Sequence, residues 1–198
     1  MIKVSLTDLV DIVSRSGTPK ATRVAQVKRR PEYEPAFDFY KPLRDHIVSV
    51  HIDGGDKGDI GKVMREIVDG KKLRNYPPLI DGYVKWWGRK TFAWLDPPRV
   101  SYEANGVEVI INPELGLEFG GARHVIKLYF KADPLSKTRA DIIVHLMELS
   151  LRPICGQEER MSVLDVRNAR LIAYNGAVLV KPMIDAELAY IASLWSSV

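Results

Sequence analysis

The segment from Val107 to Lys131 constrains the fold of this chain most strongly, because alternating hydrophobic residues flank a Gly120-Gly121 pair. A two-residue turn at those glycines predicts a long β-hairpin and fixes its register, so that Glu114 faces Lys127. Side chains alternate between the two faces of a strand. One face of the predicted hairpin is therefore apolar and belongs to a core, with the side chains Leu115, Leu117, Phe119, Ile126, Leu128 and Phe130.

The opposite face of the hairpin carries Glu114, Gly116 and Glu118 on one strand and Arg123 and Lys127 among others on the next. A carboxylate opposite a lysine, beside a glycine that leaves the surface open, is typical of a site for a metal ion and a phosphate. Solvent-exposed cross-strand ion pairs produce the same pattern, and each contributes only about 0.2 to 1 kcal/mol. The sequence leaves both interpretations of this face open.

The composition is that of a globular protein, with 198 residues of which 46% are hydrophobic and 27% are charged. No apolar run approaches the roughly 20 residues of a membrane span, and the first residues do not resemble a signal peptide. We therefore expect a cytoplasmic protein without membrane contact. A single cysteine, Cys155, excludes an internal disulfide and a multi-cysteine zinc site. The formal net charge of +4 favours polyanionic partners only mildly.

The first 50 residues are predicted to form a basic helical segment that precedes an α/β domain spanning residues 51–198. Ser5 or Thr7 caps a first helix, and Ser16-Gly17 separates it from a second helix that ends near residue 30. This outline is typical of a helix-turn-helix that reads DNA, although a run of charge is more often a solvated helix face. The predicted contacts to DNA or RNA are the cations of the second helix, Lys20, Arg23, Lys28, Arg29 and Arg30.

The segment from residue 79 to residue 95 interleaves aromatic residues with the cations Lys85, Arg89 and Lys90. Proteins that bind single strands use such aromatic rings to stack on bases and such cations to hold phosphates. Tryptophan and tyrosine are also common where a helix packs on a sheet, and we favour this packing role.

The order of the predicted elements indicates an α/β (α+β) fold with a central mixed sheet, helices on its faces and a helical N-terminal extension. A helix over residues 59–69, closed by Gly70, precedes a three-stranded meander that starts at Val100. A helix capped by Ser136 or Thr138 and a strand from Met161 to Tyr174 follow. The core order is α-β-β-β-α-β.

This order resembles that of the PD-(D/E)XK nuclease superfamily, the restriction-endonuclease-like fold, over roughly residues 59–180. In that family an acid on the second core strand, often preceded by proline, is followed on the third strand by an acid, any residue and a lysine. Pro113-Glu114 and Lys127 match this motif. Val125 stands where the family carries its second metal ligand.

The resemblance implies Mg²⁺-dependent hydrolysis of phosphodiesters in DNA or RNA, with Glu114 holding the metal ion and Lys127 orienting water or stabilising charge. A single carboxylate holds Mg²⁺ poorly. Glu118 lies about 13 Å from Glu114 along the strand, too far to share one ion. Some members of the family recruit an acid from the preceding helix, and Glu66 or Asp59 is the candidate here. The predicted catalytic set is Glu114, Lys127 and Glu66.

Two alternatives to a nuclease remain. The same fold without catalysis would bind nucleic acid or protein through its cationic surfaces. In an accessory protein the order of elements would be coincidental, and the tryptophans and the last helix would serve packing or self-association. The sequence leaves the oligomeric state open, a dimer included.

Overall fold

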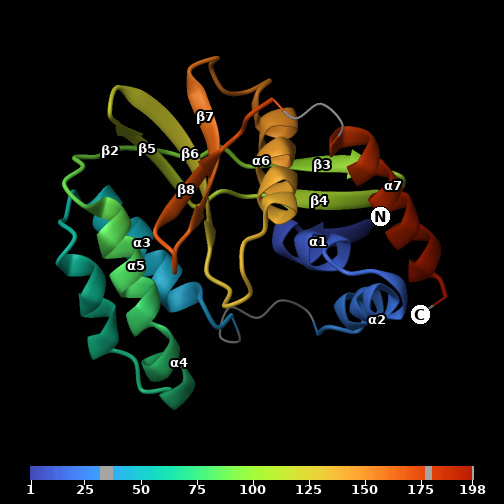
Figure 1. Cartoon of the computed structure of the whole chain (residues 1–198), viewed down its shortest axis with the longest axis horizontal. Helices are drawn as coiled ribbons and strands as arrows, with labels where there is room; N and C mark the ends of the chain where they lie inside the picture. The colour runs from blue at the N-terminus through green and yellow to red at the C-terminus, as the bar shows by residue number, and fades with distance from the viewer. Residues whose placement is uncertain (32–37, 177–179, 198) are drawn as a thin grey trace.

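The computed structural model describes residues 1–31, 38–176 and 180–197 and shows a mixed α/β fold with two β-sheets (Figure 1). The first part of the chain is mainly helical and contains β1 (Ile2–Ser5), α1 (Leu6–Val13), α2 (Gly17–Lys28), α3 (Lys41–Ile52), the 3-10 helix η2 (Asp59–Arg65), α4 (Gly70–Asn75) and α5 (Pro77–Trp87). The second part contains β2 (Ala93–Leu95), β3 (Val100–Ala104), β4 (Val107–Ile111), β5 (Leu115–Phe119), β6 (Ala122–Tyr129), α6 (Lys137–Leu151), β7 (Glu159–Asp165), β8 (Arg170–Ala173) and α7 (Val180–Trp195).

The larger sheet has the strand order β2-β5-β6-β7-β8. Strands β6 and β7 are parallel, and the other neighbours are antiparallel. Helix α6 connects the parallel pair, as such a connection requires. The mixed α/β class is therefore confirmed, and α5-β2-β5-β6-α6-β7 has the order α-β-β-β-α-β, but α5 and β2 take the places expected for the helix over 59–69 and the strand that starts at Val100.

The smaller sheet has the order β1-β4-β3 and includes the first residues of the chain. Ile2 pairs with Val107 in a parallel ladder. Asn105 and Gly106 join β3 to β4 with φ angles of 54° and 77°, the backbone that a tight hairpin turn requires. The expected boundary between residues 50 and 51 falls inside α3, and the N-terminal segment supplies a strand to the fold rather than only helices.

The expectation of one long hairpin and a three-stranded meander is wrong. The hairpin strand breaks at Pro113, so β4 and β5 belong to different sheets. Proline has no backbone N–H to donate to a ladder, which favours a break at this point. Beyond the break the predicted register is confirmed, since Leu115 pairs with Ile126 and Phe119 with Ala122 across the Gly120-Gly121 turn.

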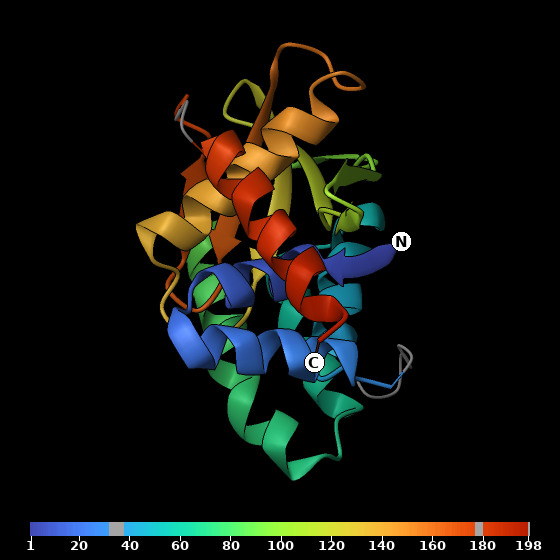
Figure 2. The ribbon, with the colours of Figure 1, turned by 90° about the vertical axis from the view of Figure 1, so that its right-hand side faces the viewer.

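Two hydrophobic clusters cover both faces of the larger sheet. The predicted apolar face packs beneath α3 and α5 in one cluster, with Leu115, Leu117, Ile126, Leu128 and Phe130 buried there. The opposite face enters a second cluster through Val125 and Tyr129, together with α1, α6 and α7. Helices α2 and α7 lie side by side at this end of the molecule (Figure 2). The part of the charged face around Glu114 and Lys127 is therefore enclosed, whereas Glu118 and Arg123 near the turn stay about half exposed.

Two local predictions also differ from the structure. The helix expected over residues 59–69 is the shorter 3-10 helix η2, and Gly70 starts α4 instead of closing a helix. The Asp69 side chain accepts hydrogen bonds from the backbone N–H groups of Lys71 and Lys72, both at 2.8 Å, and so fixes a new helix start. The strand expected from Met161 is the antiparallel pair β7 and β8. No helix in the described ranges is both long and apolar enough to cross a membrane.

Candidate functional site

Glu114 and Lys127 meet where the chain passes from the smaller sheet to the larger one. The Glu114 N–H donates to the carbonyl of Ile126 at 3.1 Å, so this residue continues the ladder of β5 by one hydrogen bond. The Glu114 carboxylate accepts the backbone N–H of Leu128 at 2.7 Å through Oε2. The Glu114 side chain thus accepts a backbone hydrogen bond from β6 beside Pro113, where the strand breaks.

The Lys127 ammonium group completes this arrangement. It lies 2.5 Å from Oε1 of Glu114, 2.9 Å from the carbonyl of Asn112 and 3.2 Å from the Oδ1 atom of Asn112. An ammonium group has three protons to donate, and three acceptors surround it here. The expected contact of Glu114 with Lys127 is therefore confirmed. We call Asn112, Glu114 and Lys127 the junction cluster.

The two charged side chains of the junction cluster are largely buried, although Asn112 is exposed, so the interpretation of this face as a solvent-exposed ion-pair ladder does not describe Glu114 and Lys127. The side chains of Lys127 and Glu114 are only 9% and 11% exposed. Val125, on the same face of β6 as Lys127, is 4% exposed and packs in a hydrophobic core. The position that the resemblance assigns to a second metal ligand is thus filled by packed hydrocarbon.

The sequence suggested that Gly116 leaves the surface of the sheet open, but in the structure it does not. A Cβ atom at this position would collide with the backbone carbonyl of Leu95 on the neighbouring strand β2. Glycine is required because another backbone lies against it. Nothing in a single sequence distinguishes this reason from an open binding surface, because strand β2 is short and its pairing is not local.

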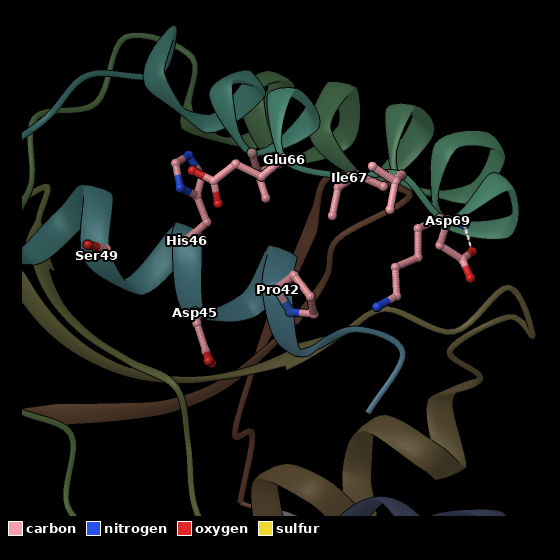
Figure 3. A pocket seen from close by; sticks show the side chains of 10 residues that line it. Pro42, Asp45, His46, Ser49, Glu66, Ile67 and Asp69 are labelled. Carbon is pink, nitrogen blue, oxygen red and sulfur yellow. Dashed lines mark hydrogen bonds between the residues drawn. The ribbon is translucent and has the colours of Figure 1, made fainter. Parts of the chain in front are cut away.

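Glu66 lies outside the junction cluster. It follows η2 and lines a cleft of about 600 Å³ between α3 and the segment that links η2 to α4 (Figure 3). Glu66 is not a hydrogen-bond or ion-pair partner of Glu114 or Lys127. In the ranges that the structure describes, no group of three or more His, Cys, Asp or Glu residues could hold a metal ion. The predicted triad is not assembled.

The junction cluster has little chemistry to offer in this arrangement. Both oxygens of the Glu114 carboxylate accept a hydrogen bond, and the donor at Oε1 is itself a cation, which opposes the approach of a metal ion to that oxygen. The Lys127 ammonium has no proton left to orient a water molecule. Its contacts instead bind the segment around Pro113 to β6. The signal in the sequence was Asn112 beside Pro113, a pair that favours a turn.

The basic residues of α2 are mostly used within the molecule. Lys20 forms an ion pair with Glu187 on α7. Arg23 pairs with Asp8 at 3.1 Å and with Asp11 at 3.0 Å, both on α1. Lys28 donates to the carbonyl of Trp195 at 2.6 Å. These contacts fasten α2 to its neighbouring helices.

Arg30 and Asp8 form a two-bond contact that also stabilises this helical layer. Arg30 donates to the two carboxylate oxygens of Asp8 at 3.0 and 2.9 Å. Burial alone would raise the pKa of Asp8, but hydrogen bonds from Arg30 and Ser5 outweigh it and hold that pKa below its usual value. Of the five predicted nucleic-acid contacts, Arg29 is exposed without an ion pair to any described residue. Asp8 and Asp11, three residues apart on one helix face, were the overlooked signal.

A second group of cations lies at the C-terminal end of α5. Lys85 and Arg89 are exposed and form no ion pair within the described part of the chain. Lys57 donates to the Gly88 carbonyl at 2.9 Å, and Lys90 lies over the Trp86 ring, 5.1 Å from its centroid. We call Lys57, Lys85, Arg89 and Lys90 the α5 basic cluster. Trp86 and Trp87 themselves are 5% and 8% exposed, so the packing role of the aromatic residues is confirmed.

Comparisons with known proteins add no assignment: no family model matches the chain, and neither a curated protein nor a solved structure matches it. The geometry of the described residues is therefore the basis for a functional proposal.

Proposed function

We propose that this protein is a non-catalytic binding protein with a nuclease-like core, and that its partner is nucleic acid. The observation that supports it is the pairing of Glu114 with Lys127, which uses all three ammonium protons and places a cation beside the carboxylate that would hold a metal ion. The packed Val125 side chain at the second ligand position supports the same conclusion. The proposal includes a cytoplasmic location, which the single cysteine favours.

The α5 basic cluster supports the choice of nucleic acid as partner. Lys85 and Arg89 have no acidic partner among the described residues, and the ammonium groups of Lys57 and Lys90 contact only neutral carbonyls and a ring. Cations without internal counterions are the groups that bind phosphates and release the counterions of a nucleic acid. The helix dipole of α5 also favours cations at this end, where Lys85, Arg89 and Lys90 lie.

The catalytic alternative, a Mg²⁺-dependent nuclease with Glu114, Lys127 and Glu66, keeps the match of Pro113-Glu114 and Lys127 to the family motif in its favour. For it to hold, Glu114 must release Lys127 and a second acid must approach. Both proposals are tested together by incubating plasmid DNA and RNA with the protein in Mg²⁺ or Mn²⁺. We expect no cleavage above that of a Glu114→Gln, Lys127→Met double variant. Cleavage that this variant loses would overturn the non-catalytic proposal.

Binding is tested by the fluorescence anisotropy of a labelled single-stranded oligonucleotide of about 20 residues. If the four cations of the cluster contact phosphates, the affinity should fall about 50-fold between roughly 50 and 200 mM salt. Lys85→Glu with Arg89→Glu should abolish most of the binding and reduce the salt dependence. The matched control is Lys3→Glu with Lys137→Glu, which changes the charge equally on β1 and α6. Equal affinity of the two double variants would contradict the assignment of this surface.

A further inference from the structure

Positive charge is concentrated in one stretch of the chain, residues 57–90, which contains η2, α4 and α5. This stretch has nine lysines and arginines and four acids, a net charge of +5, whereas the whole chain has a net charge of +4. In the fold it forms the end of the molecule that lies opposite α2 and α7 (Figure 1). A charge asymmetry of this kind indicates a polyanionic partner at the basic end.

Most of this charge is not neutralised within the molecule. Asp59 pairs with Lys62, and Asp69 accepts backbone hydrogen bonds at the start of α4. The acids that remain in the stretch are Glu66 and Asp81, which are exposed. Against these two acids stand five exposed cations that form no ion pair with a described residue, namely Arg65, Lys71, Arg74, Lys85 and Arg89. The surface is therefore cationic even after its own acids are counted.

Lys71 and Arg74 place part of this charge away from the α5 basic cluster. Helix α4 ends at Asn75 and α5 begins at Pro77, so α4 adjoins the N-terminal end of α5, and the α5 basic cluster lies at its C-terminal end. The 11 residues of α5 span about 16 Å at roughly 1.5 Å per residue. A duplex displays one phosphate for about every 1.7 Å of its axis. Such a partner presents phosphates along the whole distance between the two groups of cations.

The cationic stretch offers no aromatic ring on which a base could stack. Its four aromatic side chains are all buried, namely Tyr76, Tyr83, Trp86 and Trp87. Phe92 and Trp94, which follow the stretch, are half-buried and pack against the same core cluster. Proteins that bind single strands gain about 1 to 3 kcal/mol for each base stacked on a ring. Without this gain the attraction to phosphates determines the affinity, and a duplex carries about twice the phosphate density of one strand.

We propose that this surface binds a double-stranded nucleic acid through its phosphates, along α4 and α5, without recognition of the base sequence. The inference rests on the proposed function and adds the form of the nucleic acid and two contact residues, Lys71 and Arg74. Contacts to phosphates position a protein on a duplex but carry no sequence information. Duplexes of DNA and of RNA share this chemistry, so the experiment includes both.

The test is fluorescence anisotropy of the full chain with labelled strands of about 20 residues, used alone and as duplexes. A duplex should bind at least about tenfold more tightly than either of its strands at the same salt concentration. A smaller difference would overturn the inference and leave the proposed function standing. Failure of every probe to bind at roughly 50 mM salt would instead overturn the proposed function.

The sequence of the duplex is varied in the same assay. Two DNA duplexes of unrelated sequence should bind with affinities within about twofold of each other, because only phosphates are contacted. A larger difference would contradict binding without sequence recognition. The tighter of the DNA and RNA duplexes of one sequence identifies the source of the phosphates.

Lys71→Glu with Arg74→Glu tests whether α4 belongs to this surface. If these two cations and the four of the α5 basic cluster contact phosphates, the logarithm of the duplex affinity should fall with the logarithm of the salt concentration with a slope of about −5. The variant lacks two contacts, so its slope should be about −3.5 and its affinity at least about tenfold lower.

The matched control is Lys3→Glu with Lys137→Glu, which changes the net charge equally on β1 and α6. All four substituted side chains are exposed, so both variants should unfold at the urea concentration of the wild type. Equal duplex affinities of the two double variants would remove α4 from the surface and overturn the inference. The Lys85→Glu, Arg89→Glu variant then still tests the proposed function independently.

Discussion

The junction cluster and the exposed surface of Arg65, Glu66, Lys71 and Arg74 contain the same kinds of charged residue, yet they differ in what those charges contact. In the junction cluster Glu114 and Lys127 satisfy each other and their neighbours in a buried position. On this surface Glu66 and the nearby cations are exposed and form no ion pair within the described part of the chain. The first arrangement connects two sheets, whereas the second is available to a partner. The proposed binding surface therefore rests on unpaired surface charge rather than on the charges of a motif.

The largest change in the free energy of unfolding is expected from Lys127→Met, which leaves the Glu114 carboxylate buried without its cation. Removing one partner of a buried ion pair costs about 3 to 5 kcal/mol. We expect a loss of this size in the free energy of unfolding, measured with urea. The control is Lys137→Met, which removes an exposed i,i+4 pair with Asp141 and should cost less than about 0.5 kcal/mol. Equal losses in the two variants would remove the distinction between buried and exposed charge.

The second largest effect is expected from acid, which should lower the free energy of unfolding by protonating the buried histidines His51 and His124. Burial lowers the pKa of His51 to about 4, and burial with a contribution from Arg160 lowers the pKa of His124 to about 4. Their stability contribution is complete above the unfolded-state pKa of about 6.5 and decreases as pH falls toward the folded value. Each histidine should cost about 2 kcal/mol of stability between roughly pH 7 and pH 5.

The measurement is urea unfolding at both pH values, with His124→Phe as the diagnostic variant. The ring of His124 stacks on Phe119 with centroids 4.3 Å apart, so phenylalanine preserves the packing. This variant should lose about half of the pH dependence, because one of the two titrating groups is gone. A wild-type stability that stays constant over this range would contradict the assignment of two buried neutral histidines.

Gly116→Ala tests whether glycine is needed at position 116 because the backbone of β2 lies against it. A Cβ atom at Gly116 would collide with the carbonyl of Leu95, so β2 would have to move. We expect a loss of about 1 to 3 kcal/mol, the usual cost of overpacking. Gly61→Ala is the control, because a Cβ atom at Gly61 meets nothing within 4 Å. If both substitutions are neutral, β2 does not pack against β5 as described.

The smallest effect on the free energy of unfolding is expected from changes to the exposed cations Lys71 and Arg74. Lys71→Ala and Arg74→Ala should each change the free energy of unfolding of the monomer by less than about 0.5 kcal/mol. Urea unfolding at low protein concentration measures this value without a contribution from self-association. A loss larger than 1 to 2 kcal/mol, the size seen for internal contacts, would show that these cations have partners within the molecule.

Local patterns predicted the parts of this fold that depend on neighbouring residues. The register across Gly120-Gly121, the Asn105-Gly106 turn and the helix capped by Ser136 follow from turn and capping chemistry. Pro113 is the residue at which the expected long hairpin breaks, and neither this break nor the assignment of β4 and β5 to different sheets was predicted. That assignment depends on β1 and β2, whose pairings join distant segments.

The candidate site was predictable in its pairing and not in its environment. Alternation and turn length placed Glu114 against Lys127, and the ion pair is present. The burial of this pair depends on α6 and the second sheet, which no local pattern positions. In the same way, the acids Asp8 and Asp11 were visible on one face of the first helix, but no local pattern placed them or Glu187 against the basic residues of α2.

A double-mutant cycle on Glu114→Gln and Lys127→Met, followed by urea unfolding, tests the central claim most directly. If the pair is a structural connection between the sheets, the double variant should be clearly more stable than the sum of the single losses implies. We expect a coupling energy above about 2 kcal/mol. A coupling energy near zero would show that Glu114 and Lys127 do not stabilise each other, and would contradict their assignment as a structural pair.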